Sequence, residues 1–520
     1  MAKTDKLPPM MGWSTWNLLH QNISEETVIE VAESIKSNGL LAAGYSYINL
    51  DDCWQASTRD ENMRLQFDVG LFPSKNGIVN KLNGLGFKAG IYSSSGNYTC
   101  EDMPGSYGFE DLDAKTFVEW GFELLKYDYC HVVDLPTDPH FEHQGYANQT
   151  PPILYVAISG LGSSGYEKVL HSNVAEVTAP AYLKDGAIYG LHCTRAAAIF
   201  ELDIPADGQY QLAIGYVKEE SPHKRFLLAS INGMPDAQIW FPPTSGWNSP
   251  ARATATVILK AGKNTLMLTN PIRGQREDSM LRYIRMGEAL KNAAPPNKPI
   301  YYSICEHGRT KPWTWAKDVA SSWRVSGDIS DNWEAVVRNY EIAADLWEYQ
   351  QPGTYNDPDM LEVGVGNLTD LENQSHFVLW CMLAAPLVLG LDVRTASAKT
   401  LGLITDPELI AINQDELLLQ ASRIMIKDGL DLLIKPLTDG RCAVCLFNKS
   451  EMTISNITVP VEMLLTDRRV TLDLSKDIFA TDILCGKTRY RLEKTLDIQE
   501  ILPHGVVLLI LDGHLCTLTN

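Results

Sequence analysis

The sequence predicts an α/β protein: a (β/α)8 barrel with a β-sandwich inserted after its fourth strand, followed by an antiparallel β-domain. Short apolar strands alternate with amphipathic helices over residues 1–134, and this alternation resumes over 280–415, with four units on each side. Such units form parallel strands with right-handed crossovers, and eight of them close a barrel. Between them, 135–279 lacks helical periodicity and contains short strands separated by turns, which is typical of an antiparallel sandwich.

Local signals define the elements in the first half of the barrel. Ser24 precedes apolar residues at helical spacing and Gly39 follows them, so a helix is predicted between these two residues. The other elements are a strand at 45–50, a helix at 76–83, a strand at 88–92, a helix at 114–120 and a strand that begins at Leu124. This last strand leads into Lys126 and Asp128. Charged groups directly after an apolar strand are costly to desolvate unless each has a partner or a task, so this strand end is a candidate for chemistry.

The block at 135–279 resembles carbohydrate-binding modules of the jelly-roll kind. It combines apolar strands with the sequences Asp-Gly-Gln-Tyr and Ile-Asn-Gly, a pattern that many β-sandwich modules share. Tyr216, Trp240 and Trp247 are candidates for stacking on a sugar ring, although the sequence favours packing in the core or in loops. The predicted strands are 198–204, 210–216, 226–231, 253–259 and 265–268.

Helical periodicity returns near Arg282 and supplies the second half of the barrel. The predicted elements are a helix at 282–290, strands at 300–304 and 322–324, a helix at 332–350, a strand-end segment at 355–360, a helix at 376–385 and a strand at 387–391. After about Asp415, alternating strands such as 432–436 and 506–511 predict a terminal antiparallel β-domain over 416–520.

Composition limits the partners of the protein. The 520 residues carry a formal net charge of −20, which argues against nucleic acid or an anionic membrane surface and fits a neutral substrate such as a sugar. No run of 18 apolar residues is present, so no membrane span is predicted. The N-terminal residues lack an apolar core and predict no signal peptide, which gives a cytoplasmic location as the default, with secretion as the alternative if a leader was removed. The sequence leaves the oligomeric state open, a homo-oligomer included.

No cofactor or metal is predicted. The chain has no P-loop, no GxGxxG and no HExxH sequence. Ten cysteines in 520 residues do not make a disulfide scaffold. Cys442 and Cys445 have the spacing of half a zinc site, but no second pair matches it, and their apolar surroundings predict buried thiols in a strand.

Polar and aromatic residues collect at the predicted strand ends. An acidic residue after a strand is more often a helix N-cap than a catalyst, so no single one is diagnostic. Together they would line one mouth of the barrel, in a mixture that suits the recognition of a polyol. The residues are Trp16, Asp51, Asp52, Tyr92, Lys126, Asp128, Cys305, Glu306, His307, Arg324, Asp328, Asp357 and Asp359.

These residues lie in motifs that resemble glycoside hydrolase family 27, the α-galactosidases and α-N-acetylgalactosaminidases of clan D. The motifs occur in family order and cover about 12–134 and 282–415, while the inserted block lies outside them. They are Met11-Gly12-Trp13 with Trp16, Tyr47-Ile48-Asn49-Leu50-Asp51-Asp52-Cys53-Trp54, Gly90-Ile91-Tyr92-Ser93 through Cys100, Leu124-Leu125-Lys126-Tyr127-Asp128, Cys305-Glu306, Trp323-Arg324 with Asp328-Ile329, Asn356-Asp357-Pro358-Asp359-Met360, and Ile410-Ala411-Ile412-Asn413-Gln414-Asp415.

The resemblance implies a retaining exo-glycosidase that releases terminal α-linked galactose by double displacement. Asp128 would be the nucleophile, and Asp328 would protonate the leaving oxygen and then activate water. Lys126 stands two residues before Asp128 on the same face of its strand, so we expect it to keep that carboxylate ionised. For the acid step Asp328 needs a raised pKa, a property that the sequence does not disclose.

The family also implies a binding role for the other strand-end residues. Asp51 and Asp52 would bind the O4 and O6 edge of galactose, Lys126 would reach O3 and O4, Arg324 and Glu306 would face C2 and C3, and Trp16 would pack on the ring; Tyr92, Cys305, His307 and Asp359 complete the expected substrate-binding set. Cys100 and Cys130 match a family disulfide.

One segment departs from the family pattern. Tryptophan often follows Cys-Glu in the family, or small residues fit a 2-acetamido group, whereas this chain has His307-Gly308-Arg309. The group at C2 of the sugar is therefore less well defined than its axial O4, and His307 is either a site residue or a packed loop residue. The alternatives within the family are α-N-acetylgalactosaminidase, β-L-arabinopyranosidase and isomalto-dextranase. A non-catalytic carbohydrate-binding protein is the alternative from another class.

Overall fold

The computed structural model describes residues 6–96, 98–130, 151–161, 166–179, 181–191, 196–217, 225–241, 250–269, 279–427, 429–467, 469–470 and 477–512. The chain divides into two compact units. One consists of Met1–His131 together with Tyr283–Asn520, and the other is Val132–Arg282.

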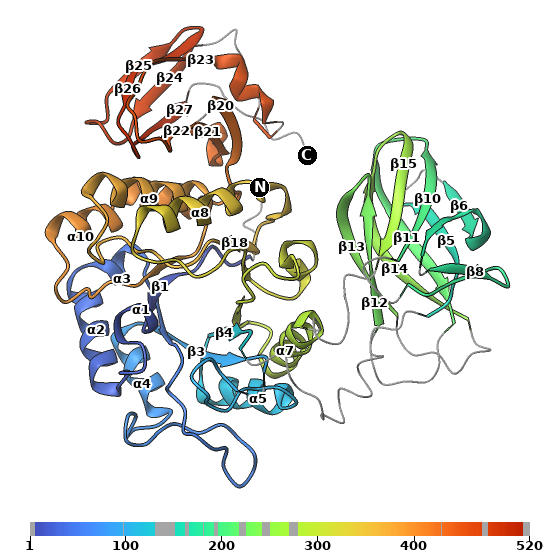
Figure 1. Ribbon diagram of the computed structural model, residues 1–520, viewed down its shortest axis with the longest axis horizontal. Coiled ribbons are helices and arrows are strands. Elements are labelled where there is room, and N and C mark those ends of the chain that lie inside the picture. Colours follow the sequence, from blue (N-terminus) through green and yellow to red (C-terminus); the bar gives the residue numbers. More distant parts are fainter. Residues whose placement is uncertain are drawn as a thin grey trace. The chain divides into compact units, whose positions relative to one another are not determined.

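Eight parallel strands form a TIM barrel in the first unit, as predicted (Figure 1). In spatial order they are β18 (Tyr355–Asp357), β17 (Ser322–Arg324), β16 (Tyr301–Ile304), β4 (Leu124–Asp128), β3 (Lys88–Ser94), β2 (Tyr47–Leu50), β1 (Met11–Ser14) and β19 (Leu387–Leu389). The ring is closed by a parallel bridge between Leu361, just after β18, and Leu389. Leu124 of β4 pairs with Tyr301 of β16, so the strands on either side of the insertion are direct neighbours.

Side-chain caps fix the beginnings of several barrel helices. Ser24 accepts a hydrogen bond from Thr27 N (3.2 Å) at the start of α2, which ends near the left-handed Gly39 as predicted. The helices of this unit are α1 (Trp16–Leu19), α2 (Glu25–Ser37), α3 (Leu40–Ala43), α4 (Gly77–Leu85), α5 (Glu110–Trp120), α7 (Ser279–Ala293), α8 (Trp333–Ala344), α9 (Asp370–Met382), α10 (Ala398–Ile404) and α11 (Pro407–Asn413).

The helices differ most from the predicted ranges at the end of α8 and the start of α9, and α5 also begins at Glu110, before its predicted start at 114. The helix predicted at 332–350 ends at Ala344, where Ala343 O accepts hydrogen bonds from Leu346 N (3.0 Å) and from Gln420 Nε2 (2.7 Å). The helix predicted from 376 begins at Asp370. Thr369 and Glu372 form a capping box there, a local signal for an N-terminus six residues earlier.

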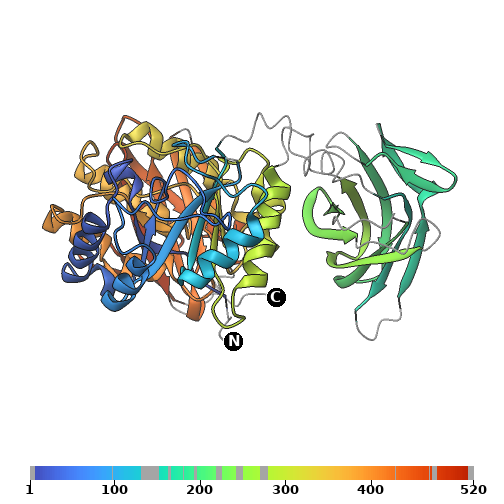
Figure 2. The same ribbon diagram turned by 90° about the horizontal axis from the view of Figure 1, so that it is seen from below.

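The unit Val132–Arg282 is an antiparallel sandwich, as its strand pattern predicts. One sheet has the order β13-β12-β15-β10-β7, and the other has β14-β11-β5-β9-β8, with β6 paired to β5. Figure 2 shows the same unit, in green, from a second direction. Tyr216 is buried against Phe241, which agrees with core packing; the side chain of Trp240, and Trp247, lie outside the described residues. The strands are β5 (Ile153–Gly160), β6 (Glu167–His171), β7 (Glu176–Thr178), β8 (Tyr182–Lys184), β9 (Ala187–Tyr189), β10 (Ala197–Ile204), β11 (Gly208–Tyr216), β12 (Arg225–Ile231), β13 (Met234–Phe241), β14 (Ala251–Leu259) and β15 (Gly262–Thr269).

The C-terminal strands form an antiparallel domain that packs on the barrel beside α9 (Figure 1). Lys435 Nζ donates to Cys381 O of α9 (2.9 Å), and Tyr340 Oη of α8 donates to Asp431 (2.9 Å). Cys442 and Cys445 are buried in β22, as predicted. The strands are β20 (Ser422–Lys427), β21 (Leu430–Pro436), β22 (Cys442–Asn448), β23 (Ile454–Pro460), β24 (Ile478–Asp482), β25 (Arg489–Leu492), β26 (Thr495–Ile501) and β27 (Val506–Asp512). Within the described part of the chain, no helix is long and apolar enough to cross a membrane.

Candidate active site

An open cavity lies at the carboxyl ends of the barrel strands and encloses about 1060 Å³, its mouth included. The structure brings most of the predicted site residues together in its wall. Exceptions are Cys305 and Asp357, which line a second cavity inside the barrel, and Glu306, His307 and Cys130. The wall consists of Trp16, Asn17, His20, Asp51, Asp52, Tyr92, Cys100, Lys126, Asp128, Arg324, Asp328, Ile329, Ser330, Asp331, Asp359, Met360, Glu362 and Val365.

Asp128 is the last residue of β4, and both of its carboxylate oxygens accept hydrogen bonds. Tyr92 Oη donates to Oδ2 (3.1 Å), and the backbone N–H of Tyr129 donates to Oδ1 (2.8 Å). Burial, and then the charge of Asp128, raise the pKa of the Tyr92 phenol well above its usual value, so the phenol stays protonated as a donor. These two donors fix the direction of the carboxylate and leave it facing the cavity.

Lys126 forms an ion pair with Asp51. It lines the cavity with Asp128, in agreement with the predicted shared face, and its Nζ lies 2.8 Å from Asp51 Oδ2. Burial alone would lower the pKa of Lys126; the charge of Asp51 above all, with that of Asp128, outweighs burial and raises the pKa well above the usual value. Tyr92 Oη and the backbone N–H of Tyr129 donate the hydrogen bonds to Asp128, whereas Lys126 pairs with Asp51.

Asp51 and Asp52 follow β2 and are both buried. Ser14 Oγ (3.1 Å) and Asn49 Nδ2 (3.2 Å) also donate to Asp51 Oδ2. Asp52 accepts from the N–H groups of Cys53 (2.8 Å) and Glu101 (3.1 Å). Burial nevertheless raises the pKa of Asp52 to about 6. The two carboxylates are thus held in place by neighbours before any ligand binds.

Arg324 joins two carboxylates on the opposite wall. It is buried at the end of β17 and donates from Nη1 to Asp359 Oδ1 (2.8 Å) and from Nη2 to Asp328 Oδ1 (2.6 Å). His307 Nε2 lies 3.3 Å from the same oxygen of Asp328. The hydrogen bond from His307, with the charge and hydrogen bond of Arg324, lowers the pKa of Asp328 well below its usual range. The Asp328 side chain is 73% exposed, so solvent screens this effect.

Glu306 is placed differently from its expected position at the sugar. Its side chain is buried, and Oε1 accepts hydrogen bonds from the backbone N–H (2.9 Å) and the hydroxyl (2.5 Å) of Thr310. It contributes to the turn that follows β16 and is not part of the cavity wall.

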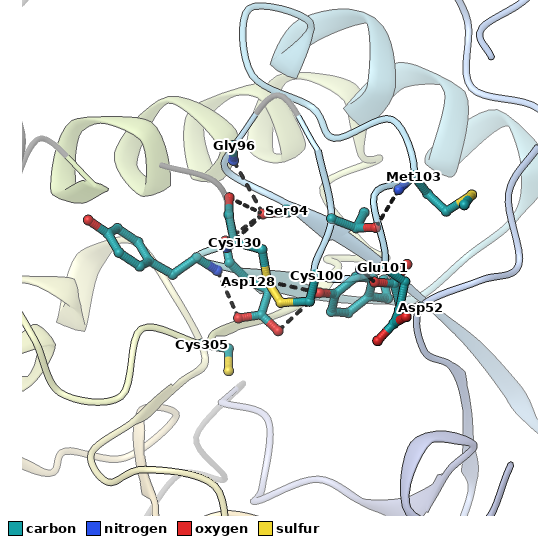
Figure 3. The surroundings of a disulfide bond; sticks show 12 residues. Asp52, Ser94, Gly96, Cys100, Glu101, Met103, Asp128, Cys130 and Cys305 are labelled. Carbon is teal, nitrogen blue, oxygen red and sulfur yellow. Dashed lines mark hydrogen bonds between the residues drawn. A yellow bond between two sulfur atoms is a disulfide. The ribbon is translucent and has the colours of Figure 1, made fainter. Parts of the chain in front are cut away.

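Cys100 and Cys130 form a disulfide that lies beside the candidate nucleophile (Figure 3). Their Cα atoms are 5.0 Å apart. The Tyr92 hydroxyl, which donates to Asp128, also lies 3.7 Å from Cys130 Sγ. The next residue, Glu101, supplies the N–H bound to Asp52. The disulfide therefore ties the loop after β3 to the end of β4 at the edge of the cavity.

The sequence did not single out several cavity residues: Asn17, His20, Asp331 and Glu362. Glu362 is buried and accepts a hydrogen bond from Asn17 Nδ2 (2.5 Å). Burial, and then the charges of Asp359 and Asp331, raise its pKa to about 7. Its position three residues after Asp359, on the same strand-end segment, is the signal that points to it.

Among the described residues, two groups have donor atoms close enough to share a metal ion. Cys100, Asp128 and Cys130 form one, but its two sulfurs are joined in the disulfide. The other consists of Asp128, Cys305 and His307. Burial raises the pKa of the Cys305 thiol well above its usual value, which disfavours the thiolate that binds metals. Neither donor set favours a metal.

A parallel (β/α)8 barrel whose strand ends surround one open cavity with several carboxylates, a lysine and an arginine is an architecture that suits a glycoside hydrolase. The family model described as alpha-galactosidase A matches residues 8–155 and 261–415, and that of the alpha-galactosidase C-terminal β-sandwich domain matches 427–511. The chain therefore belongs to the alpha-galactosidase family, as the resemblance to glycoside hydrolase family 27 predicts. Residues 156–260 of the inserted sandwich lie outside these matches.

Relatives and solved structures agree with this assignment. An alpha-galactosidase of Cyamopsis tetragonoloba is 30% identical over 85% of this chain and 73% of its own length, and alpha-galactosidase 2 of Arabidopsis thaliana is 30% identical over 87% and 78%. The structure of alpha-galactosidase I from Mortierella vinacea has the same fold, with a TM-score of 0.65 at 24% identity over 98% of each chain.

Proposed function

We propose that this protein is a retaining exo-α-galactosidase that hydrolyses terminal, non-reducing α-D-galactosyl residues of oligosaccharides or glycans. The observation that carries the proposal is the shared cavity: Asp128 from β4 and Asp328 from the segment after β17 line it together. Membership of the alpha-galactosidase family supports the same activity. An alpha-galactosidase of Saccharomyces cerevisiae has been solved with raffinose, an example of the kind of substrate expected.

In the first step Asp128 attacks the anomeric carbon and forms a glycosyl ester with it, while the leaving oxygen takes a proton from Asp328. In the second step Asp328 removes a proton from water, and the water hydrolyses the glycosyl ester. The contacts of Asp128 suit the nucleophile, because Tyr92 Oη and Tyr129 N donate to its carboxylate. Asp328 is ionised by its present partners, which is the form required for the second step. A sugar in the cavity would exclude water from Asp328 and raise its pKa towards the value that the first step needs.

The remaining wall suits a neutral hexose. Lys126 and Asp51 form a fixed donor and acceptor pair, and Asp52 and Asp359 offer further carboxylate oxygens. Trp16 lines the same cavity and supplies an aromatic face for the C–H side of a sugar ring. An aspartate at position 51, in place of a bulkier group, leaves room for C6 and O6, which favours a hexose over arabinopyranose.

A panel of 4-nitrophenyl glycosides tests the substrate. The α-D-galactopyranoside is expected to be cleaved fastest, ahead of the α-N-acetylgalactosaminide and the β-L-arabinopyranoside. Faster cleavage of either rival would reject the galactosidase proposal in favour of that activity. Sugar binding without cleavage of any member would instead favour a carbohydrate-binding protein.

Replacing the nucleophile tests the mechanism. Asp128→Ala should abolish turnover, and added azide should restore it with β-galactosyl azide as the product, the inverted configuration expected when azide replaces the nucleophile. Asp111→Ala, at an exposed position of α5, is the control for expression and folding. An unchanged rate for Asp128→Ala would remove this residue from the mechanism.

A further inference from the structure

The turn after β16 has an unusual backbone that presents His307 to the cavity edge. His307 has φ +56° and Gly308 has φ +72°. A left-handed conformation is strained for a residue other than glycine and persists only where its surroundings enforce it. Here Gly308 N donates to Arg324 O (3.0 Å), and a Cβ at Gly308 would lie 2.4 Å from Val325 O. The turn is thus pressed against the end of β17, which carries Arg324.

His307 lies near both candidate catalytic carboxylates. Its Nε2 is 3.3 Å from Asp328 Oδ1. One of its ring nitrogens, a carboxylate oxygen of Asp128 and the sulfur of Cys305 all lie within 4.8 Å of one another. The His307 side chain is 46% exposed, so it is open to solvent while contacting Asp328. If His307 only packed within its loop, neither the contact with Asp328 nor the proximity to Asp128 would be required.

The first step of the proposed reaction needs a proton that Asp328 alone holds poorly. Arg324 Nη2 lies 2.6 Å from Asp328 Oδ1 and stabilises the carboxylate. An imidazole next to that carboxylate provides a second place for the same proton, because the two groups titrate as a pair. An ordinary histidine keeps its proton to about pH 6.5, whereas an ordinary aspartate loses it near pH 3.9.

We propose, on the basis of the proposed galactosidase function, that His307 is a positioning residue that stores the proton which Asp328 delivers to the leaving group. In the free enzyme the proton resides on the imidazole. On substrate binding it passes to Asp328 and then to the glycosidic oxygen, as the C1–O bond breaks and Asp128 bonds to C1. In the second step water gives a proton to Asp328, and that proton returns to His307. No redox partner is required.

Other charged and titratable groups near His307 define its electrostatic surroundings. Arg324 and Asp328 face it from the β17 side, and Asp128 from the end of β4; on its own turn, Cys305 and Glu306 precede it, and Arg309 lies over the Tyr129 ring, 4.8 Å from the centroid. Two carboxylates and one guanidinium therefore lie near the imidazole.

The test replaces His307 by asparagine, which tolerates left-handed backbone and does not titrate near neutral pH. Lys311→Asn is the matched control, since Lys311 has φ +55° in the same turn and is exposed. Each variant is assayed on methyl α-D-galactopyranoside, whose leaving group needs protonation, and on the 4-nitrophenyl galactoside, whose leaving group needs little. His307→Asn should lose about tenfold or more in kcat/KM on the methyl glycoside and much less on the nitrophenyl one.

The pH profile distinguishes proton storage from a structural role. In His307→Asn the basic limb of kcat/KM should move to lower pH by about one unit or more, because the proton now depends on the carboxyl alone. A basic limb that stays in place or moves to higher pH would overturn the inference, and so would an equal loss of kcat/KM on both substrates. His307→Gln, measured in the same way, serves as a second variant. Failure of the proposed function is recognised separately, because the wild-type enzyme would then cleave neither galactoside.

Discussion

Lys126 Nζ lies 2.8 Å from Asp51 Oδ2, although the two residues come from the ends of strands that β3 separates. The pair spans β3 and joins β4, which carries the candidate nucleophile, to the segment after β2 that carries Asp51 and Asp52. Both side chains are largely withdrawn from solvent, at 21% and 3% exposed. The pair therefore holds two side chains of the cavity wall in a fixed arrangement.

Removing one partner of this pair should destabilise the protein. Lys126→Met leaves the Asp51 carboxylate buried without its cation and should lower the free energy of unfolding by about 3 kcal/mol. Urea unfolding of Lys126→Met, Asp51→Asn and the double variant measures the coupling. The double variant should lose less than the sum of the single losses, and strict additivity would argue against a direct interaction.

Loss of the disulfide should affect both stability and the site. The Cys100→Ser/Cys130→Ser variant should unfold with about 3–4 kcal/mol less free energy, as expected for a closed loop with a separation of 30 residues. Its KM for a galactoside should rise, because Cys100 lines the cavity and Glu101 N binds Asp52. Wild-type protein treated with reductant should behave like the variant. Cys485→Ser, at an exposed free cysteine, should change neither property.

Glu362 should make stability depend on pH. Burial raises its pKa from 4.5 to about 7, so between these values the folded protein binds the proton that the unfolded chain releases. The stability of the wild type should therefore fall, relative to Glu362→Gln, as pH rises from about 4.5 to 7, by at most about 1.4 kcal/mol per pH unit. The free energies of unfolding of the wild type and Glu362→Gln, measured across this pH range, check the prediction. The exposed Glu33→Gln should follow the wild type. If Glu362→Gln also followed the wild type, the raised pKa of Glu362 would be contradicted.

The turn that carries His307 should not tolerate a side chain at Gly308. Gly308→Ala combines a strained positive φ with a contact of 2.4 Å to Val325 O, so the turn must move. We expect a loss of about 1–3 kcal/mol in stability together with reduced kcat. Gly84→Ala is the control, since it lies in α4 with nothing within 4 Å and should be neutral or slightly stabilising. Unimpaired activity of Gly308→Ala would mean that the turn is not held in place by this contact.

The barrel was predictable because its signals are local and repeated. The helix that follows Ser24 and the strand that leads into Asp128 can each be recognised from short windows, and right-handed crossovers then leave one topology. The ends of α8 and α9 were placed less well. A carbonyl in the last turn of α8 accepts a hydrogen bond from Gln420, a contact remote in sequence, whereas the start of α9 has a readable capping box at Thr369.

The sequence was sufficient to predict which strand ends form the site. It was less informative about which site residues form ion pairs and hydrogen bonds with one another. The alternation of a strand places Lys126 and Asp128 on one face, but it does not say which carboxylate, across a closed ring, the ammonium will reach. Glu306 accepts hydrogen bonds from Thr310 within the turn after β16 and lies outside the cavity wall. In the same turn Gly308 packs closely against Val325, a contact between segments that sequence patterns do not encode.

The pairing of β4 with β16 has a consequence for how the chain folds. These neighbours meet only after Val132–Arg282 has been accommodated between them. Entropy opposes the closure of an unstructured tether, but only logarithmically with its length. The inserted sandwich has a hydrophobic core of its own, so most of that tether is a folded body in the native chain. An insertion at this point therefore adds little to the entropy cost of pairing β4 with β16.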